Sequence, residues 1–566
     1  MFETSKSLEE KYEQVTISQF MTSGASFQKF EADESIPEHV KELYFTSLAA
    51  LENADQRSRL AEMLRNYADC FAVNSDDIGR TDLVKHEIDT GDAKPVHQRC
   101  RRFCKAHIKV IRDTIAKQHA SGIIRPSNSN WASNPVIVKK KTGEYRVCID
   151  YRGLNGVTVN PDSYMLPRID DTLDALAGAK FFCTLDLTQG YHQVELEEGS
   201  KHKTAFHAPY CNPSQWEYNY MPFGLVKAPR TFQRLMDKVI QGLEYETALC
   251  YIDDIIVFGP TINSVLDRMT VVLERLRAAK LKLKAKKCIL FAKKVKYLGH
   301  VITSEGVTTD PDKVKDVVNW HPPRTVRQVR AFLGMINYYS RFIRNLQGIA
   351  SPLHVISGKN SRFCWGKAEQ KAFETLKNSL VTARVMSYPR QEGMFILDTD
   401  ASDHCMGAVL SQLQEDDGVV EEKPIAYASK KFDAREAKYC ARRRELLAIV
   451  NFVKHFDVYL RGVTFMIRTD HASLRYIRTV QSLPAQFFRW IMTLEEYSYK
   501  IEIRKGILHG NADGMSRGCH GAGCICDELE KFERKNNVRK GVILDETEHE
   551  VHSFQVNPHA AVTLHA

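Results

Sequence analysis

Two adjacent aspartates, Asp253 and Asp254, interrupt the apolar run ALCYIDDIIVF at 248–258. Short runs rich in β-branched and aromatic residues are typical of buried strands. Neighbouring carboxylates repel each other, and loss of water penalises both charged forms, so a cation or a solvent-exposed turn must compensate. A hairpin turn alone would account for the pair, because Asp is common in turns. The run therefore predicts two buried strands that meet at an acidic tip.

A third carboxylate, Asp186, follows a similar apolar segment in FFCTLDLTQGYHQV at 181–194. Three aspartates without a nearby Cys or His set form an oxygen-only site of the kind that Mg²⁺ prefers. Two Mg²⁺ ions held about 4 Å apart can activate a 3′-hydroxyl and stabilise a pyrophosphate leaving group. The three residues thus predict a two-metal phosphoryl-transfer site.

The chain of 566 residues is too long for one hydrophobic core, so we expect several domains. Strand-like and helix-like segments alternate without a regular βαβ order, which favours α+β folds with mostly antiparallel sheets. An apolar stripe predicts a helix over 324–345, and a second α+β unit is expected from about residue 392. Hydrophobic residues at 43% and charged residues at 26% exclude a mainly disordered or fibrous protein.

The net charge of +9 is compatible with a polyanionic partner. Fourteen cysteines at irregular spacing indicate reduced thiols and not a disulfide framework. The N-terminus lacks the apolar core of a signal peptide, and no apolar run approaches 18 residues. We therefore expect a soluble, intracellular protein that does not enter membranes.

A second acidic series occurs in the C-terminal half of the chain. Two of its members close expected strands, and one starts an apolar helix. Each of them alone is explained by a helix cap or an exposed carboxylate. The members are Asp400 in LDTDAS, Glu445 in RRELLAIV, Asp470 in IRTDHAS and Asp513 in GNADGMSR.

Several motifs in one order resemble the reverse transcriptase of gypsy-type LTR retrotransposons, and the resemblance spans roughly 86–517. The motifs are CIDYRGLN at 148–155, LDLTQGYHQVEL at 185–196, MPFGLVKAPRTFQRLMD at 221–237, YIDD at 251–254, YLGHVIT at 297–303 and RAFLGMINYYSRFI at 330–343. The resemblance implies an α+β, multidomain chain: a right-hand polymerase with fingers, palm and thumb/connection, followed by a ribonuclease H-like α/β domain. The expected regions are an N-terminal extension of unknown role (1–85), fingers and palm (86–303), thumb/connection (304–388), ribonuclease H (389–517) and a polar tail (518–566).

The resemblance also implies roles for polymerase residues. Asp186, Asp253 and Asp254 would be palm metal ligands, and Tyr191 would be a steric gate that clashes with a ribonucleotide 2′-hydroxyl. An aromatic core residue is the alternative for Tyr191. The residues expected to contact the incoming dNTP are Arg146 and Lys140 at its triphosphate, with a shift of one lysine within 139–141 left open, and Phe223 beneath the nucleotide. A solvated turn is the usual role of such a lysine run.

The second acidic series matches the four carboxylates of ribonuclease H in the same family, Asp400, Glu445, Asp470 and Asp513. They would hold two Mg²⁺ ions, with Mn²⁺ as a substitute, and activate water to cut the RNA of an RNA–DNA hybrid. The expected partners of the whole protein are an RNA template, a DNA primer, the RNA–DNA hybrid and dNTPs. His509 would assist product release or be an exposed loop residue.

The chain departs from the family pattern at several positions. Lys227 and Arg230 replace the usual Asn and small residue, which either strengthens phosphate contacts or reflects drift. The run Arg442-Arg443-Arg444 beside Glu445 is expected on the helix surface. A catalytically silent, domesticated binding protein and a polymerase with an idle nuclease remain the alternative functions.

Other motifs are set aside. Asp89-Thr90-Gly91 resembles an aspartic-protease motif but lacks apolar strands on both sides, so a turn is expected. A zinc site would need a standard spacing, and the candidate ligands do not show one; these are Cys519, His520, Cys524, Cys526, His549 and His552.

Overall fold

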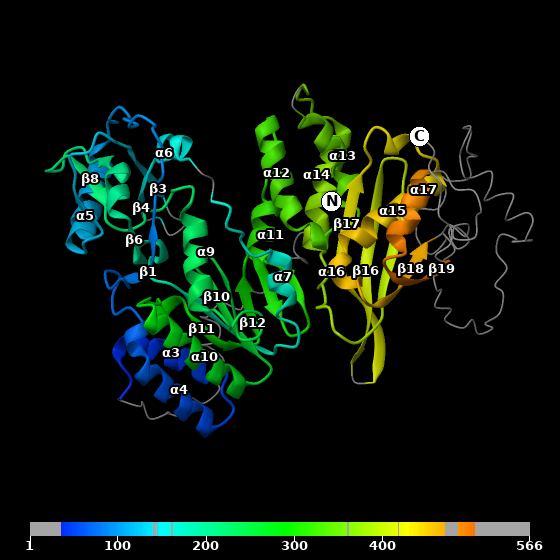
Figure 1. The fold of residues 1–566 in the computed structure, drawn as a ribbon, viewed down its shortest axis with the longest axis horizontal. Coiled ribbons are helices and arrows are strands. Elements are labelled where there is room, and N and C mark those ends of the chain that lie inside the picture. The colour runs from blue at the N-terminus through cyan, green and yellow to red at the C-terminus, as the bar shows by residue number, and fades with distance from the viewer. Residues whose placement is uncertain are drawn as a thin grey trace, which may run out of the picture. The chain divides into compact units, whose positions relative to one another are not determined.

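The computed structural model divides into two compact units (Figure 1). Unit 1 comprises Met1–Arg168 and Gly178–Lys293, and unit 2 comprises Ile169–Ala177 and Lys294–Ala566. The structure describes residues 35–139, 143, 145–159, 162–358, 361–416, 418–469 and 485–503. Each unit has a separate hydrophobic core and is described here by itself.

Unit 1 mixes short strands with helices. In chain order its elements are α3 (Glu38–Leu48), α4 (Ala54–Asn66), η2 (Ala68–Cys70), β1 (Thr81–His86), α5 (Lys105–Ala120), β2 (Ile124–Pro126), β3 (Pro135–Lys139), β4 (Tyr145–Ile149), α6 (Arg152–Val157), β5 (Phe181–Asp186), η3 (Gly190–Gln193), β6 (Val194–Leu196), α8 (Glu198–Lys201), η4 (His202–Thr204), β7 (Phe206–His207), β8 (Gln215–Tyr218), α9 (Ala228–Val239), β9 (Ala248–Tyr251), β10 (Asp254–Gly259), α10 (Ile262–Ala278), η5 (Ala285–Lys287) and β11 (Ile289–Ala292).

The four-stranded sheet β11-β5-β10-β9 lies in the part of unit 1 that the sequence predicts to be the palm. Helix α10 packs on β5 and β10 through an apolar stripe that includes Val265, Met269 and Val272. Its first turn is fixed by a capping box between Thr261 and Ser264. Helices α3 and α4 from the N-terminal region pack on α10, η5 and β11, so the described part of that region belongs to the palm core.

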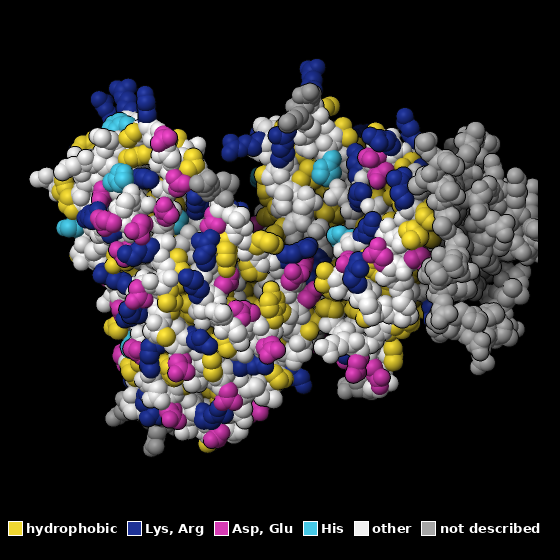
Figure 2. All heavy atoms as spheres, viewed as in Figure 1, with side chains coloured by type: hydrophobic (Ala, Val, Ile, Leu, Met, Phe, Trp, Pro, Cys, Tyr) yellow, Lys and Arg dark blue, Asp and Glu magenta, His cyan; other side chains and the backbone are white. Residues whose placement is uncertain are grey.

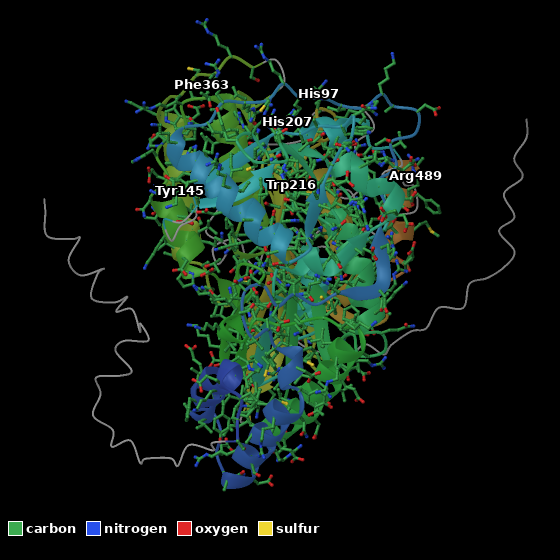
Figure 3. All side chains as sticks on the ribbon, turned by 90° about the vertical axis from the view of Figure 1, so that its left-hand side faces the viewer. His97, Tyr145, His207, Trp216, Phe363 and Arg489 are labelled. Carbon is green, nitrogen blue, oxygen red and sulfur yellow. The ribbon has the colours of Figure 1, made fainter. Side chains whose placement is uncertain are left out.

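The fingers of unit 1 contain helix α5, the three-stranded sheet β2-β8-β7 and the hairpin β3-β4. Helix α5 ends just before Gly122, whose φ of +70° lies in the left-handed region that glycine tolerates. Figure 3 shows His97 and His207 close together near one end of the fingers, and their ring centroids lie 5.3 Å apart. Strands β3 and β4 pair antiparallel, from Pro135 opposite Ile149 to Lys139 opposite Tyr145.

Unit 2 begins with a short helix and a three-stranded sheet, continues with a helical region and ends with a larger sheet. In chain order its elements are α7 (Ile169–Asp174), β12 (Lys294–Tyr297), β13 (His300–Thr303), β14 (Val307–Thr309), α11 (Pro311–Val318), α12 (Val326–Tyr338), η6 (Ser340–Phe342), α13 (Leu346–Ile356), α14 (Lys367–Val381), β15 (Phe395–Ala401), β16 (Cys405–Asp416), β17 (Val419–Lys431), η7 (Glu436–Lys438), α15 (Ala441–His455), α16 (Asp457–Leu460), β18 (Thr464–Thr469), α17 (Ala485–Leu494) and β19 (Ser498–Ile503).

The sheet of unit 2 has the order β17-β16-β15-β18-β19, with β15 antiparallel to β16 and parallel to β18. Helix α15 packs against β15 and β16 with an almost wholly buried apolar face. The distant segment α7 joins this unit because the Arg341 guanidinium donates to the Asp174 carboxylate at 2.8 Å.

Most of the predicted elements are confirmed, with one clear difference. The helix predicted over 324–345 ends at Tyr338, and the chain continues as the short 3-10 helix η6. Tyr339 and Phe342 are buried beyond the helix end, so the apolar stripe continues where the helix does not. Asp89 and Gly91 form the predicted turn, in which the Gly91 N–H donates to the Asp89 carboxylate at 2.9 Å. In the described ranges, every helix is too short or too polar to cross a membrane.

Candidate active sites

Two of the three predicted metal-binding aspartates, Asp186 and Asp254, lie on adjacent strands, and Asp253 lies in the loop beside them. In the antiparallel pair β5 and β10, Asp186 and Asp254 are direct partners. Strands β9 and β10 pair Tyr251 with Asp254, which leaves Ile252 and Asp253 as the two residues of the hairpin loop. The register therefore brings Asp186 to the acidic tip that holds Asp253 and Asp254, as the sequence predicts.

The hairpin tip is strained and braced. Ile252 has a φ of +59°, which is unfavourable for a β-branched residue. The fully buried Gln233 of α9 accepts a hydrogen bond from the Ile252 N–H at 2.7 Å and donates to the Cys250 carbonyl at 3.1 Å. Gln233 thus fixes the loop that carries Asp253. Sequence reasoning missed this residue, since a glutamine in an amphipathic helix gives no signal beyond its place in the motif 221–237.

The acidic tip shifts the pKa of both hairpin aspartates upward. Desolvation by the surrounding protein is the largest cause, although both side chains still reach solvent. Repulsion from Asp253 and Asp186 adds to it and raises the pKa of Asp254 to about 6. The Lys287 ammonium, which lies 2.8 Å from the Asp186 carboxylate, acts in the opposite direction and lowers the pKa of Asp253 and Asp254. Two crowded carboxylates that disfavour their own charge are a donor set suited to a divalent cation.

Asp186 lies near the tip, but in the described part of the chain its carboxylate does not form a metal-ligand cluster with Asp253 and Asp254. Within the described ranges, no three acidic, His or Cys side chains lie close enough together to hold one metal ion. The Asp186 carboxylate is instead engaged by Lys287. The chemistry of the three oxygen donors fits Mg²⁺, and binding of the ion would require Asp186 to exchange this partner.

The residues predicted to contact a nucleotide form an aromatic group beside the tip. The Tyr191 ring lies 5.0 Å from the Phe223 ring and 5.4 Å from the Phe232 ring. The Arg146 guanidinium stacks over Phe223 at 4.1 Å. Burial, with repulsion from Asp253, raises the pKa of Tyr191 to about 12, so its hydroxyl stays neutral at working pH. The structure therefore brings Tyr191, Phe223 and Arg146 together, while Lys140 lies outside the described residues.

An arginine-rich pocket lies elsewhere in the fingers. Its volume is about 480 Å³, and it is lined by Gln98, Arg99, Arg101, Asn134, Asp150, Arg152 and Gly153. The Asp150 carboxylate accepts hydrogen bonds from Arg152 at 2.7 Å and from Arg101 at 3.1 Å. These contacts, Arg152 first, lower the pKa of Asp150 to about 2. Figure 2 shows Lys and Arg side chains gathered at the upper end of unit 1, a surface suited to phosphate groups.

The second site joins a strand end to a helix. Asp400 is exposed near the end of β15, and Glu445 is fully buried in the first turns of α15. The Glu445 carboxylate accepts a hydrogen bond from the Ala401 N–H at 3.0 Å, which holds α15 beside Asp400. Two of the four predicted ligands are therefore brought together. Asp470 and Asp513 lie outside the described residues, as do His509 and the Cys519–Cys526 and His549–His552 candidates.

The arginine run beside Glu445 differs from expectation, because it is not simply exposed. Arg443 stacks over the Tyr439 ring at 3.8 Å and contacts Phe487. The Arg444 side chain is only 13% exposed and donates to the Ser402 carbonyl at 2.9 Å and the Asp403 carboxylate at 2.8 Å. Arg443 and Arg444 are therefore only partly exposed where the sequence predicts a surface run, because aromatic rings and carbonyls accept their charged groups.

Arg230, which departs from the family pattern, also has a partner in the structure. Its guanidinium donates to the Asp162 carbonyl, while Arg234 pairs with the Asp162 carboxylate at 2.8 Å. Arg230 therefore holds the loop that carries Asp162 against α9.

Comparison with known families decides what these sites belong to. Residues 137–302 match the family described as "Reverse transcriptase (RNA-dependent DNA polymerase)". Residues 390–497 match the "RNase H-like domain found in reverse transcriptase". The chain contains a reverse transcriptase domain followed by an RNase H-like domain.

The relatives of these two domains are retrotransposon polyproteins, so the predicted resemblance is confirmed. The chain is 35% identical over 487 residues to a retrovirus-related Pol polyprotein from transposon 297 of Drosophila melanogaster, with 85% of this chain and 45% of the relative covered. It is 31% identical over 427 residues to the transposon Tf2-3 polyprotein of Schizosaccharomyces pombe, with 75% and 31% covered. The chain thus spans less than half the length of these relatives.

Solved structures show the same fold. A foamy viral protease-reverse transcriptase in complex with double-stranded DNA aligns with a TM-score of 0.71 at 22% identity, covering 82% of this chain and 81% of that one. A complex of the foamy viral protein with RNA/DNA hybrid aligns with a TM-score of 0.66 at 21% identity, covering 86% and 64%. The predicted α+β reverse transcriptase fold with a ribonuclease H-like domain is confirmed.

Proposed function

We propose that this chain is an RNA-directed DNA polymerase that extends a DNA primer with dNTPs on RNA or DNA templates and degrades the RNA of RNA–DNA hybrids. The observation that carries the proposal is the register that sets Asp186 opposite Asp254 at the acidic tip, with Tyr191 and Phe223 beside it. The matched reverse transcriptase family supports the polymerase activity.

Asp186, Asp253 and Asp254 would hold Mg²⁺, or Mn²⁺ in its place, in the polymerase site. Two such ions supply activation of the primer 3′-hydroxyl and stabilisation of the pyrophosphate leaving group. Asp186 and Asp254 lie on paired strands, and Gln233 braces the loop that carries Asp253. Rigid donors need little reorganisation when charge develops.

The aromatic group would select and orient the nucleotide. Tyr191 packs edge-on to Phe232 and contacts Phe223, so its ring has little freedom to move away from a 2′-hydroxyl. Arg146 on Phe223 would transfer to the triphosphate, because a guanidinium binds phosphate oxygens in a planar, bidentate manner. Lys140 remains the proposed second phosphate contact.

The ribonuclease H-like domain would use Asp400, Glu445, Asp470 and Asp513 to hold two divalent cations. The buried Glu445 contributes a carboxylate whose orientation is fixed by Ala401. The similar foamy viral structures are complexes with double-stranded DNA and with RNA/DNA hybrid, which supports the same classes of partner for this chain. The arginine-lined pocket supports contacts with a nucleic-acid backbone.

The setting we propose is intracellular, in the cytoplasm, the nucleus or both. The cysteines in the described part of the chain are free; Cys70, Cys183 and Cys250 are among the buried ones, and Cys100 is among the exposed ones. Free thiols are typical of reducing compartments.

The test is incorporation of dNTPs on an RNA template with a DNA primer, in Mg²⁺, by wild type and by Asp253→Asn. We expect incorporation by wild type and its loss in the variant. Asp267→Asn is the matched control, because Asp267 is an exposed carboxylate of α10 that pairs with Arg59 away from the tip. Folded wild type that binds the hybrid without incorporation would support the silent, binding-only alternative.

A further inference from the structure

Two neighbouring lysines of η5 have different partners. The Lys287 ammonium lies 2.8 Å from the Asp186 carboxylate, whereas the Lys286 ammonium lies 4.0 Å from Glu42 on helix α3. Both lysines are more than half exposed. The chain therefore offers one cation aimed at the palm carboxylates and an adjacent cation aimed away from them.

The backbone fixes the position of Lys287. The Lys284 N–H donates to the Asp186 carbonyl at 2.8 Å, and the Lys287 N–H donates to the Lys284 carbonyl at 2.9 Å. Strand β11, which follows at once, pairs with β5, the strand that ends at Asp186. Helix α3 packs on η5 and β11. Lys287 is therefore part of the same rigid frame as the carboxylate that it contacts.

The contact matters because Asp186 is the only palm aspartate outside the hairpin. Asp253 and Asp254 lie next to each other in sequence, and the site needs Asp186 to complete the set of three. Among the described residues, no three such ligands already lie close enough to hold a metal ion together. The Lys287 ammonium and a divalent cation would therefore have to compete for the same Asp186 carboxylate.

We propose that Lys287 competes with the divalent cation for Asp186 and so sets the cation affinity of the polymerase site. The inference rests on the proposed function of the palm carboxylates. Lys287 supplies a built-in positive charge that balances three crowded carboxylates. Cation binding must break the ion pair and overcome repulsion from the ammonium. Lys287 is thus a positioning residue, acting through Asp186.

The test measures cation binding directly, without catalysis. Free Mn²⁺ is titrated at pH 7.5 by electron paramagnetic resonance with full-length wild type, Lys287→Met, Lys287→Arg and Lys286→Met. Binding that is lost in Asp253→Asn is assigned to the polymerase site, which separates it from the ribonuclease H-like site. Met keeps the length of the lysine stem and removes only the charge, and thermal unfolding verifies that each variant folds.

We expect the Mn²⁺ concentration at half-saturation of this site to fall about three- to fivefold in Lys287→Met, the range for a partly exposed ion pair. Lys286→Met should match wild type, and Lys287→Arg should stay within about twofold because it keeps the charge. In EDTA, Lys287→Met should also unfold at a lower temperature than Lys286→Met, since the carboxylates lose their counter-charge.

An unchanged or higher half-saturation in Lys287→Met would overturn the inference, and so would an equal fall in Lys286→Met. Failure of Asp253→Asn to remove any Mn²⁺ binding is a different result. It would contradict the proposed polymerase site itself, and the role of Lys287 with it.

Discussion

The carboxylates that we propose for the polymerase site and those that we propose for the ribonuclease H site are held in different ways. Asp253 and Asp254 lie exposed at a hairpin tip, and β-strand register brings them to Asp186, with Gln233 bracing the loop. Glu445 is fully buried and depends on a helix packing against the strand that carries Asp400. The first site is therefore fixed by backbone pairing within one sheet, and the second by packing between two kinds of element.

This difference predicts how each site fails. Where strand register fixes the site, the fold should tolerate the loss of one carboxylate side chain. The activity of that site should still depend on the loop that positions Asp253. A site fixed by a buried carboxylate links catalysis to packing, because an unpaired buried group costs about 1–3 kcal/mol. Four variants or conditions separate these behaviours.

The largest effect is expected from Glu445→Gln. The amide oxygen can still accept from the Ala401 N–H, so the domain should fold, while a charged metal ligand is lost. Hybrid cleavage should fall at least about a hundredfold, since metal-held charge stabilisation is worth several kcal/mol. Gel assays of labelled hybrid measure the loss. Glu445→Ala should in addition lower the unfolding free energy by about 1–3 kcal/mol, and equal stability of the two variants would argue against the packing role.

Gln233→Ala should break the brace of the polymerase tip. The variant loses the acceptor of the Ile252 N–H and leaves a strained loop without support. Primer extension should fall about tenfold, equivalent to about 1.4 kcal/mol, with hybrid cleavage unchanged. Steady-state extension and cleavage are measured on the same preparation. Gln233→Glu keeps one acceptor oxygen and should recover part of the activity; normal extension by Gln233→Ala would show that register alone fixes the tip.

Arg444→Ala should weaken cleavage less than Glu445→Gln. The variant loses two hydrogen bonds to the turn that follows Asp400, at Ser402 and Asp403. A three- to tenfold loss is expected, the equivalent of about 1 kcal/mol. Lys454→Ala, an exposed cation at the other end of α15, is the matched control for hybrid cleavage. If both variants behaved alike, the turn contact would have no part in the site.

The smallest effect concerns pH. The folded pKa of Asp254 is raised from 3.8 to about 6, so the folded state holds its proton more tightly than the unfolded state. Its contribution to the unfolding free energy is thus fully present below about pH 4, is lost as pH rises to about 6, and stays constant above that. Urea unfolding in EDTA should show this trend in wild type and not in Asp254→Asn. The difference should stay under about 1 kcal/mol, because the side chain reaches solvent; parallel curves would contradict the crowded-carboxylate account.

The acidic tip was predictable from the sequence because its signal is local. Asp186, Asp253 and Asp254 each break an apolar strand, and the family motifs around them fix their order. The strand pairing then follows from the register of two buried runs. Glu445 was predicted only through its match to the ribonuclease H carboxylates of the family, because an acid at the start of an apolar helix alone indicates a cap or an exposed carboxylate.

What the sequence could not show depends on contacts between distant segments. Gln233 bonds to Ile252, which is 19 residues away in the sequence, and Lys287 bonds to Asp186, which is 101 residues away. Neither polar residue interrupts a pattern, so neither gives a signal. The packing of Arg443 was not predicted because its aromatic partner Phe487 comes from another helix. The helix end at Tyr338 was missed because buried residues continue the apolar spacing past it.

The most direct test of the central claim, two independent carboxylate sites on one chain, is a crossed assay. Primer extension on RNA and cleavage of an RNA–DNA hybrid are measured in Mg²⁺ for wild type, Asp253→Asn and Asp400→Asn. Asp253→Asn should lose extension and keep cleavage, and Asp400→Asn should lose cleavage and keep extension. Loss of both activities in either folded variant, or of neither, would contradict the assignment.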